Sequence, residues 1–387
     1  MLTPSTAKDW FRSSLLPSNI RQHLATKKLR KTHPLGIIPA APKRVICEPT
    51  NACNLGCVFC GNRNMVRPWT YMPMPMYKQL LEQMKALDIK RLTLHTVGEP
   101  TMHKQLVQMV HMAKEVGMVV TLSTNGTLLD ESLARDLVAA APDILNLSLD
   151  AADEETFKEI RKGIDPKAVY ENLKTLHRIR EAEGREFDSP WGTVKLPTLV
   201  GTGLITPVFT EDEARDYFAK YGPYVDDFFF HFPNNHSGYV RDEGMRRRHW
   251  LPDRAFDWLY KKFRYSCPYP WDALFLLSDG TMSVCRFDFD ARVKIGRFPE
   301  NTLLELWNGD AMNDLRRAHM NFDFRKWTTC ESCDATWTAN RHENYRMTQK
   351  LKSRHGFKGT RNAWLTEDPM ASKEQLGSGS VEKTLGA

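Results

Sequence analysis

Short apolar runs alternate with amphipathic stretches along the first two thirds of the chain. Runs with strand character lie at 44–48, 92–96, 119–123, 144–149, 194–199 and 228–232. Segments with helical periodicity lie between them, at 76–87, 105–116, 131–139 and 169–181. This alternation is typical of parallel β/α architecture, because parallel strands need a crossover helix between them. The pattern therefore predicts six strand–helix units, with functional side chains at the carboxyl ends of the strands.

The pattern changes after these units. Residues 274–285 predict a β-hairpin with Ser278, Asp279 and Gly280 in its turn. The first forty residues predict a helix with a basic stretch, followed by a linker rich in proline, and the last residues are polar. We expect an extension at 1–43, a β/α region at 44–240, a second region at 241–345, and a basic, then polar, partly disordered tail at 346–387.

Composition narrows the class of protein. With 41% hydrophobic and 26% charged residues, the chain is globular rather than disordered. No run approaches the ~18 consecutive apolar residues of a membrane span, and no secretory signal is present, which predicts a cytoplasmic protein without a membrane partner. The net charge of +7 is mild, and Arg246–Arg248 is interpreted as solvated surface, so nucleic acid is not an expected partner.

The cysteines fall into two groups that are more than two hundred residues apart. The first group is Cys53, Cys57 and Cys60, in the pattern C-x3-C-x2-C. In a chain without a secretory signal, clustered cysteines favour metal binding over disulfides. A structural zinc site needs four ligands, whereas three thiolates from one loop can hold three irons of a cubane and leave the fourth iron open. Cys47 lies apart, on the strand face opposite Glu48, and is expected to be a buried structural thiol, with hydrogen-atom donation as the alternative.

The loop from Cys53 to Cys60 resembles the cluster-binding loop of the radical S-adenosylmethionine (SAM) enzymes, and the lead-in Glu48-Pro49-Thr50-Asn51-Ala52 is similar to the family's first strand and loop. The resemblance implies a partial (β/α)6 TIM-like barrel and a [4Fe–4S] cluster whose open iron is chelated by SAM. It also implies reductive cleavage of SAM to a 5′-deoxyadenosyl radical that abstracts a hydrogen atom from a substrate. An external one-electron donor such as flavodoxin or ferredoxin would supply the electron.

Motifs after the following strands resemble the SAM-binding motifs of the family. Val97-Gly98-Glu99-Pro100 is similar to the Gly-Gly-Glu-Pro motif that contacts the methionyl ammonium group, with valine in place of the first glycine. Arg161 stands where relatives place an arginine near the SAM carboxylate, which suits a guanidinium fork. The SAM contacts that the resemblance implies are Phe59, Gly98, Glu99, Ser123, Asn125, Ser148, Asp150 and Arg161.

The second group of cysteines is Cys267, Cys285, Cys330 and Cys333. Between them, 295–297 and 303–308 resemble the auxiliary-cluster modules of this family, the SPASM and twitch domains. Because no cysteine follows Cys333, the resemblance implies the shorter twitch form, a small α+β domain that holds one auxiliary [4Fe–4S] cluster on four cysteines. Two pairs of cysteines also suit zinc, so a zinc-binding interaction or nucleic-acid module without catalysis is the alternative of another class.

A fully ligated auxiliary cluster resembles the electron conduit of the family's dehydrogenases. The resemblance therefore implies oxidation of an alcohol carbon in a polar small molecule, such as a sugar or a cyclitol. The candidate general bases are His95 and His231 at strand ends, because the ordinary pKa of histidine lies near 6.5. The short amino-terminal extension favours a small-molecule substrate. Redox-neutral epimerisation, dehydration and peptide modification remain alternatives.

Overall fold

A nine-stranded sheet forms the centre of the computed structural model, which describes residues 20, 22–189, 192–205, 209–240, 258, 262–334 and 341–359. Its strands, from one edge to the other, are β10 (Asp227–His231), β9 (Thr198–Leu204), β5 (Ile144–Ser148), β4 (Val119–Thr124), β3 (Arg91–Leu94), β1 (Arg44–Cys47), β11 (Ala273–Leu276), β12 (Thr281–Ser283) and β13 (Lys294–Arg297). Every pairing from β10 to β11 is parallel, and β12 and β13 add antiparallel strands. This α/β fold confirms the expected class.

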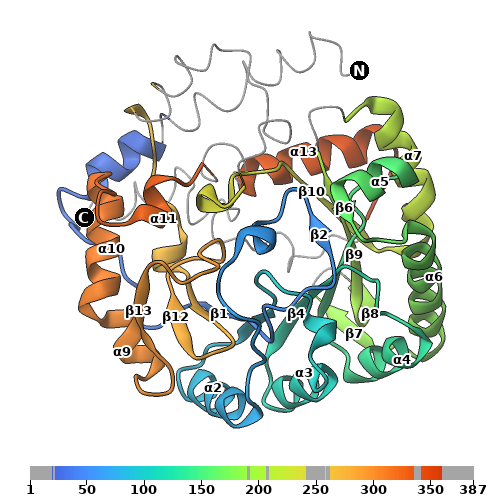
Figure 1. Cartoon of the computed structure of the whole chain (residues 1–387), viewed down its shortest axis with the longest axis horizontal. Coiled ribbons are helices and arrows are strands. Elements are labelled where there is room, and N and C mark those ends of the chain that lie inside the picture. The colour runs from blue at the N-terminus through green and yellow to red at the C-terminus, as the bar shows by residue number, and fades with distance from the viewer. Residues whose placement is uncertain are drawn as a thin grey trace.

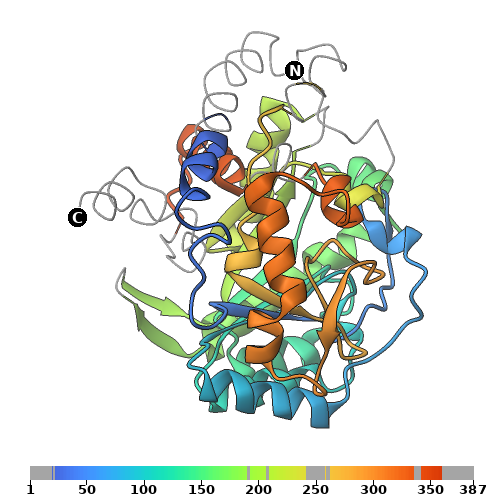
Figure 2. The same ribbon diagram turned by 90° about the vertical axis from the view of Figure 1, so that its left-hand side faces the viewer.

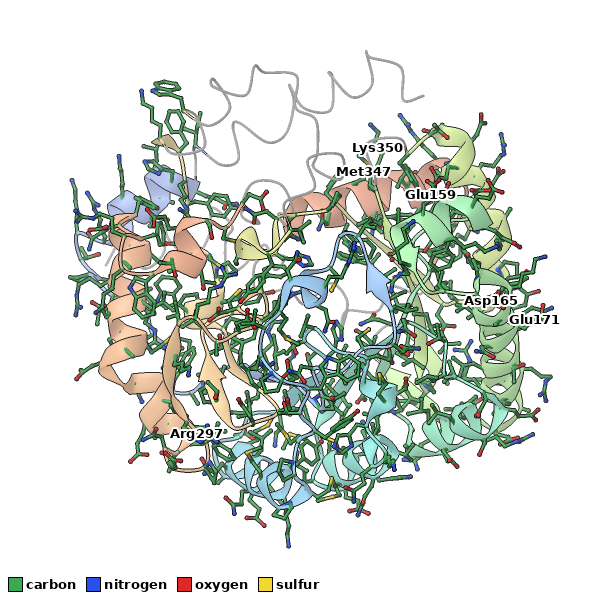
Figure 3. The ribbon with its side chains drawn as sticks, in the orientation of Figure 1. Glu159, Asp165, Glu171, Arg297, Met347 and Lys350 are labelled. Carbon is green, nitrogen blue, oxygen red and sulfur yellow. The ribbon has the colours of Figure 1, made fainter. Side chains whose placement is uncertain are left out.

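Helices cover the outside of the curved parallel sheet (Figure 1). They are α2 (Met74–Ala86), α3 (Leu106–Glu115), α4 (Glu131–Ala140), α5 (Glu154–Ile160), α6 (Pro166–Glu183) and α7 (Glu211–Tyr221). Aspartate side chains cap the first turns of α4, α5 and α6, where they accept backbone N–H groups that have no partner within the helix. Charged residues such as Glu159, Asp165 and Glu171 are exposed along the outer rim (Figure 3).

The strands alternate between an apolar face and a polar face. Leu94, Leu122 and Leu147 are buried in the main core on the helix side. On the same strands, Ser123 and Ser148 are only half-buried, and Thr93, Thr121 and Asn146 share their face. Side chains of a strand alternate between the faces of the sheet, so the second set points into the barrel. The interior of the barrel is therefore polar near the carboxyl ends of the strands.

The fifth expected strand, at 194–199, was placed wrongly. Its first residues belong to a separate hairpin of β7 (Glu186–Ser189) and β8 (Gly192–Lys195), and the strand of the main sheet is β9. Pro197 lies between β8 and β9 and has no N–H to donate, so one continuous strand through it is disfavoured. Gly201 and Gly203 weaken the apolar pattern of β9, but side chains at these positions would collide with Phe228 and Phe230 of β10.

The auxiliary region continues the barrel sheet. β11 pairs with β1 along its whole length, from Arg44 opposite Ala273 to Cys47 opposite Leu276. Beyond the strands, the region contains a 3-10 turn, η6 (Tyr269–Trp271), and the helices α9 (Leu303–Asn308), α10 (Asp310–Asn321) and α11 (Thr328–Glu331).

The amino-terminal segment packs against this auxiliary region. Residues 22–29 are helical and lie beside α10 (Figure 2). The following residues accept hydrogen bonds from two tryptophan side chains: Trp271 Nε1 donates to the Leu35 carbonyl oxygen and Trp307 Nε1 to that of Pro39, both over 2.8 Å. The indole donors thereby hold the predicted linker in place.

Helix α13 (Arg341–Arg354) lies against β10, the edge strand of the sheet. The Phe230 amide donates to Thr348 Oγ over 2.8 Å, and Lys352 forms a buried ion pair with Asp227. The segment from 346, which the sequence analysis assigns to a tail, thus continues a helix as far as Arg354. Polar side chains of this helix provide hydrogen-bonding and ionic partners for β10. The expected tail from residue 360 onward, and Arg246–Arg248, lie outside the described residues. None of the helices in the described part of the chain combines the length and the apolar character that crossing a bilayer requires.

Candidate active site

The three-cysteine loop lies over the carboxyl ends of the barrel strands. Its short strand β2 (Gly56–Cys57) pairs with β6 (Arg161–Lys162), and the turn η1 (Gly61–Asn64) follows it. The thiols of Cys53, Cys57 and Cys60 lie close enough to raise one another's pKa. Burial is the larger cause and raises the pKa of Cys53 to about 11. The Asn62 amide lies 3.5 Å from Cys60 Sγ, a contact that can stabilise a thiolate.

Arg161 joins this loop to the end of β5. Its Nε donates to Asp150 Oδ2 over 2.5 Å, and its Nη1 lies 3.6 Å from Cys57 Sγ. The guanidinium carbon lies 5.3 Å from the centre of the Phe59 ring. Asp150 Oδ1 is buried and has no hydrogen-bond partner among the described residues. The structure therefore brings together Phe59, Asp150 and Arg161 of the expected SAM contacts beside a cluster ligand.

Glu99 and Asn125 form a second group beneath the loop. Glu99 Oε2 accepts the Asn125 amide over 2.7 Å, and Glu99 Oε1 accepts the hydroxyl groups of Thr101 and Thr124. Gly98 packs so closely that an added Cβ would lie 2.1 Å from the Thr50 carbonyl oxygen. The turn therefore requires glycine at this position. Contact of Gly98, Glu99 and Asn125 with SAM remains a prediction.

The two serines of the expected set lie on the inner faces of β4 and β5. Asn146 Nδ2 donates to Ser123 Oγ over 3.1 Å. Ser148 follows Asn146 on the same face and is likewise half-buried. Both hydroxyl groups thus face the polar barrel interior, and their contact with SAM remains a prediction.

The four auxiliary cysteines gather at one place. Burial raises the pKa of the Cys285 thiol, and the nearby thiols of Cys333, Cys267 and Cys330 raise it further, so all four groups are neighbours. The Phe287 amide lies 3.3 Å from Cys285 Sγ. These chain segments are held by two charged residues: Asp288 accepts from Ser283, Arg292, Val293 and Thr329, and Arg264 donates to the carbonyl oxygens of Cys330, Glu331 and Cys333.

A buried polar network connects the two cysteine sites, and the sequence analysis did not assign a function to it. Glu48 accepts hydrogen bonds from Arg67, Thr96 and Ser278. Arg67 also donates to the Phe289 carbonyl oxygen over 2.9 Å, and Asp290 Oδ1 accepts the Arg67 amide. Glu48 directly follows β1, Arg67 follows the first cysteine group, and Ser278 begins the auxiliary turn. The only indication in the sequence was the position of Glu48 on the strand face opposite Cys47.

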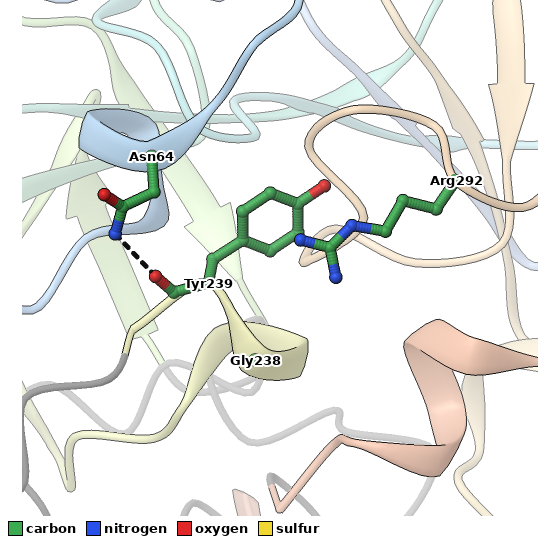
Figure 4. A pocket seen from close by; sticks show the side chains of 4 residues that line it. All are labelled: Asn64, Gly238, Tyr239 and Arg292. Carbon is green, nitrogen blue, oxygen red and sulfur yellow. Dashed lines mark hydrogen bonds between the residues drawn. The ribbon is translucent and has the colours of Figure 1, made fainter.

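A pocket of about 340 Å³ opens at the seam between the two sites (Figure 4). It is lined by Asn64, Gly238, Tyr239 and Arg292. Asn64 Nδ2 donates to the Tyr239 carbonyl oxygen over 2.6 Å, and the Arg292 guanidinium lies 3.7 Å from the centre of the Tyr239 ring. The loop after β10 therefore contacts both cysteine-bearing regions.

Three histidines lie deep in the barrel but keep some accessible surface, so they face a space that water can enter. Burial lowers the pKa of His95 to about 3, and the charges of Arg286 and Arg161 add to this effect. Burial also lowers the pKa of His231, which the negative charge of Asp150 partly opposes. His236 has its pKa lowered to about 3 by burial and by Arg286. The two expected bases, His95 and His231, thus share one interior with Arg161.

Cys47 lies outside this interior. It is fully buried in the main core, and its Sγ lies 3.3 Å from Met72 Sδ. Burial raises the pKa of its thiol far above the ordinary value. This placement is that of a packing residue on the helix side of β1.

The cysteines present fit two clusters. All seven are free thiols from segments that the fold brings into two groups, and amide N–H groups point at sulfur in each. Among the described residues, no three His, Cys, Asp or Glu side chains converge on a single-ion site. Such convergence is not required for a cubane, because each thiolate binds a different iron.

The fold and the two sites define an iron–sulfur protein built on a partial parallel barrel. Residues 47–181 match the family model described as the radical SAM superfamily, and residues 267–334 match the iron–sulfur cluster-binding domain SPASM. The chain therefore belongs to the radical SAM superfamily and carries a SPASM-type domain, with SAM and two [4Fe–4S] clusters as its cofactors. The alternative of a zinc module without catalysis is thereby set aside.

The similar curated proteins carry out different reactions. The GTP 3′,8-cyclase of Chlorobaculum tepidum is 30% identical over 167 residues, which cover 42% of this chain and 47% of that protein. The AdoMet-dependent heme synthase of Methanosarcina barkeri is 29% identical over 144 residues, 37% of this chain and 40% of that protein. The chain thus spans less than half the length of these relatives.

Solved structures share the fold at low sequence identity. BtrN, in complex with AdoMet and 2-DOIA, aligns with a TM-score of 0.51 at 18% identity, over 77% of this chain and 94% of BtrN. SuiB of Streptococcus suis, bound to the precursor peptide SuiA, aligns with a TM-score of 0.58 at 18% identity, over 82% of this chain and 74% of SuiB. These similarities establish the architecture.

Proposed function

We propose that the protein is a radical SAM oxidoreductase that oxidises an alcohol carbon of a polar small molecule, such as a sugar or a cyclitol. The observation that carries this proposal is the four-cysteine auxiliary site, whose thiols are all neighbours of Cys285. Four cysteines can ligate all four irons, so this cluster offers no iron to a substrate and is suited to accepting an electron.

When bound, SAM and the first cluster supply a 5′-deoxyadenosyl radical that takes a hydrogen atom from the substrate carbon. Residues of the chain are suited to holding SAM and the substrate in place for this step. The Arg161 guanidinium, held by Asp150 beside Cys57 and Phe59, is suited to the SAM carboxylate. Ser123 and Ser148 on the inner strand faces are suited to SAM, and Asn146 beside them offers a hydrogen bond to a substrate hydroxyl group.

His231 is the better of the two candidate bases. Asp150 lies close enough to raise its pKa, so the imidazolium formed on proton uptake is stabilised. Arg286 and Arg161 oppose the protonation of both histidines, but His95 has no neighbouring anion among the described residues that offsets them. In the proposed reaction His231 takes the hydroxyl proton of the substrate while the carbon loses a hydrogen atom, which gives a carbonyl product. The auxiliary cluster, which Cys267, Cys285, Cys330 and Cys333 would hold, would accept the remaining electron.

A reductant such as flavodoxin or ferredoxin would deliver the electron that the first cluster needs. The donor and the cytoplasmic location remain predictions.

The loop after β10 links the two cysteine sites, because the Gly61 amide donates to His236 Nδ1 and the His236 ring stacks on Phe287, with centres 4.8 Å apart. Gly61 follows Cys60 and Phe287 lies two residues after Cys285, so this contact supports electron exit toward the auxiliary site.

The test is the stoichiometry of the reaction. The reconstituted protein is incubated anaerobically with SAM, dithionite and pools of sugars and cyclitols, and 5′-deoxyadenosine is followed. We expect a hit that yields one carbonyl product for each SAM consumed. Deuterium entering the product from heavy water, without loss of two electrons, would instead support an epimerase. Loss of water would support a dehydratase, and turnover with peptides alone would support a peptide-modifying enzyme.

A further inference from the structure

Arg286 is a cation for which the described residues offer no hydrogen-bonding or ionic partner. It directly follows Cys285, it is exposed, and its guanidinium carbon lies 4.9 Å from the centre of the Phe287 ring. Its charge lowers the pKa of His95, His231 and His236, which all lie deep in the barrel. The Arg286 guanidinium and the His236 imidazole both contact the Phe287 ring, so the charge lies beside the loop after β10.

Four other arginines near the two cysteine sites have hydrogen-bonding or ionic partners. Arg161 pairs with Asp150, Arg67 pairs with Glu48, and Arg264 donates to backbone carbonyl oxygens of the auxiliary loop. Arg292 donates to the Ser237 carbonyl oxygen and covers the Tyr239 ring. Since the three histidines are neutral at pH 7, Arg286 supplies an unbalanced positive charge in their neighbourhood.

His236 provides a hydrogen-bond donor next to this charge. Its Nδ1 accepts the Gly61 amide over 3.2 Å, so the neutral ring carries its proton on Nε2. No acceptor for this Nε2–H occurs within the described part of the chain. The ring stacks on Phe287, whose ring the Arg286 guanidinium also contacts, so both donors adjoin the same aromatic side chain.

The backbone that presents His236 is strained. His236 and Ser237 have φ values of 43° and 54°, in the left-handed region that side chains other than glycine rarely adopt. Strain is retained here because the loop is held from several sides: Asn235 Nδ2 donates to the Ser332 carbonyl oxygen over 2.6 Å, and Ser332 Oγ donates to that of Ser237. The position of the imidazole is thereby fixed.

We propose that the substrate carries an oxyanion group, a carboxylate or a phosphate, which Arg286 and His236 bind at the auxiliary side of the barrel interior. A guanidinium matches the two oxygens of such a group, and charge-assisted hydrogen bonds are among the strongest in proteins. This inference rests on the proposed function and narrows its substrates to anionic ones, such as a sugar acid or a phosphorylated polyol.

The test uses anions that need no catalysis. Inorganic phosphate and ¹³C-acetate are added separately to the reduced holoprotein, and the paramagnetic relaxation that the clusters cause in their ³¹P and ¹³C resonances reports binding nearby. We expect relaxation enhancement with the wild type and loss of about tenfold in affinity in Arg286→Gln, as the loss of charge-assisted hydrogen bonds implies. Arg286→Lys should lie between them. Arg325→Gln, a change at a solvent-exposed arginine, is the matched control and should bind as the wild type does.

The outcomes are distinct. Relaxation enhancement of phosphate, of acetate or of both in the wild type, weakened in Arg286→Gln, supports the site and identifies the anion that it binds. No enhancement with the wild type, or equal enhancement in Arg286→Gln, overturns it. If Arg286→Gln loses iron, His236→Phe repeats the test, because phenylalanine keeps the stacking on Phe287 but lacks the donor. Anion binding without SAM cleavage would contradict the proposed function alone, and SAM-dependent oxidation without anion binding at Arg286 would contradict this inference alone.

Discussion

Some side chains at the carboxyl ends of the strands have buried polar atoms that lack a hydrogen-bond partner among the described residues. Asp150 Oδ1 and His95 Nδ1 are both buried without a hydrogen bond among the described residues. Leaving a buried polar atom unpaired costs about 1–3 kcal/mol, so such atoms point to a ligand that completes them. We therefore expect SAM or the substrate to provide the missing partners of these two atoms.

His231 should set the acid limb of the pH profile. Burial lowers its pKa below the ordinary 6.5. A base works in its neutral form, so activity should be complete above the folded-state pKa and should fall as the pH drops through it. We therefore expect kcat/KM for product formation to stay flat from pH 8 to about 6.5 and to decline only below that value. His231→Gln should lower turnover by about 10²–10⁴-fold. A limb centred above pH 7 would exclude His231 as the base.

Gly98→Ala should disturb the turn after β3, which is expected to bind SAM. The added methyl group would meet the backbone of Thr50, which cannot move aside as a side chain can. We expect reduced iron in the first cluster and a lower melting temperature. Gly222→Ala is the control, because its Cβ would meet only Phe357 at an ordinary distance of 3.6 Å. Equal melting temperatures and iron contents for the two variants would refute the packing argument.

Among the elements, the edge strand β10 depends on α13. A strand edge leaves N–H and C=O groups unpaired, and here side chains of a helix take the place of a neighbouring strand. Thr348 Oγ accepts the Phe230 amide over 2.8 Å, and Asn344 Oδ1 accepts that of Phe232 over 3.4 Å. The helix thereby closes the barrel sheet on the side away from the auxiliary region.

Thr348→Val keeps the shape of the side chain and removes the acceptor. The Phe230 amide would remain buried without a partner, so the free energy of unfolding in urea should fall by about 1–3 kcal/mol. Lys350→Ala, at a half-buried position on the same helix (Figure 3), should change it by less than about 0.5 kcal/mol. A loss as large in Lys350→Ala as in Thr348→Val would mean that α13 acts through its general packing.

At the scale of the whole molecule, one continuous sheet runs through the two regions that carry the cysteine sites. Ile46 of β1 packs with Ala273 and Phe275 of β11 in a small core of their own. Removing the auxiliary region would expose this core and open the edge of β1. A chain that ends at residue 262 lacks both β11 and α13, leaves both edges of the parallel sheet open, and should therefore aggregate on expression. Replacing Cys267, Cys285, Cys330 and Cys333 by serine keeps the strand and should give a soluble protein with about four irons instead of about eight. A soluble, monomeric truncated chain would show that the regions fold independently.

The sequence predicted five of the six barrel strands near their observed positions, because their apolar runs are short and bounded by turns. It also predicted which cysteines belong together, since Cys53, Cys57 and Cys60 are adjacent along the chain. It could not predict that β11 pairs with β1, because a parallel pairing at such sequence separation leaves no local pattern. Arg286 was missed for a similar reason: a single arginine becomes informative only when the histidines near it are known, and these lie after β3, at the end of β10 and in the loop after β10.

The pairing of β1 with β11 also has a consequence for biosynthesis. More than two hundred residues separate the two strands, so β1 must wait for its partner while most of the chain is translated. At about 5–20 residues per second, this delay lasts on the order of ten to forty seconds. During that time the half-finished barrel presents an open strand edge at the ribosome. The nascent chain should therefore need protection by chaperones, and the auxiliary cluster can assemble only after the last cysteine, Cys333, has emerged.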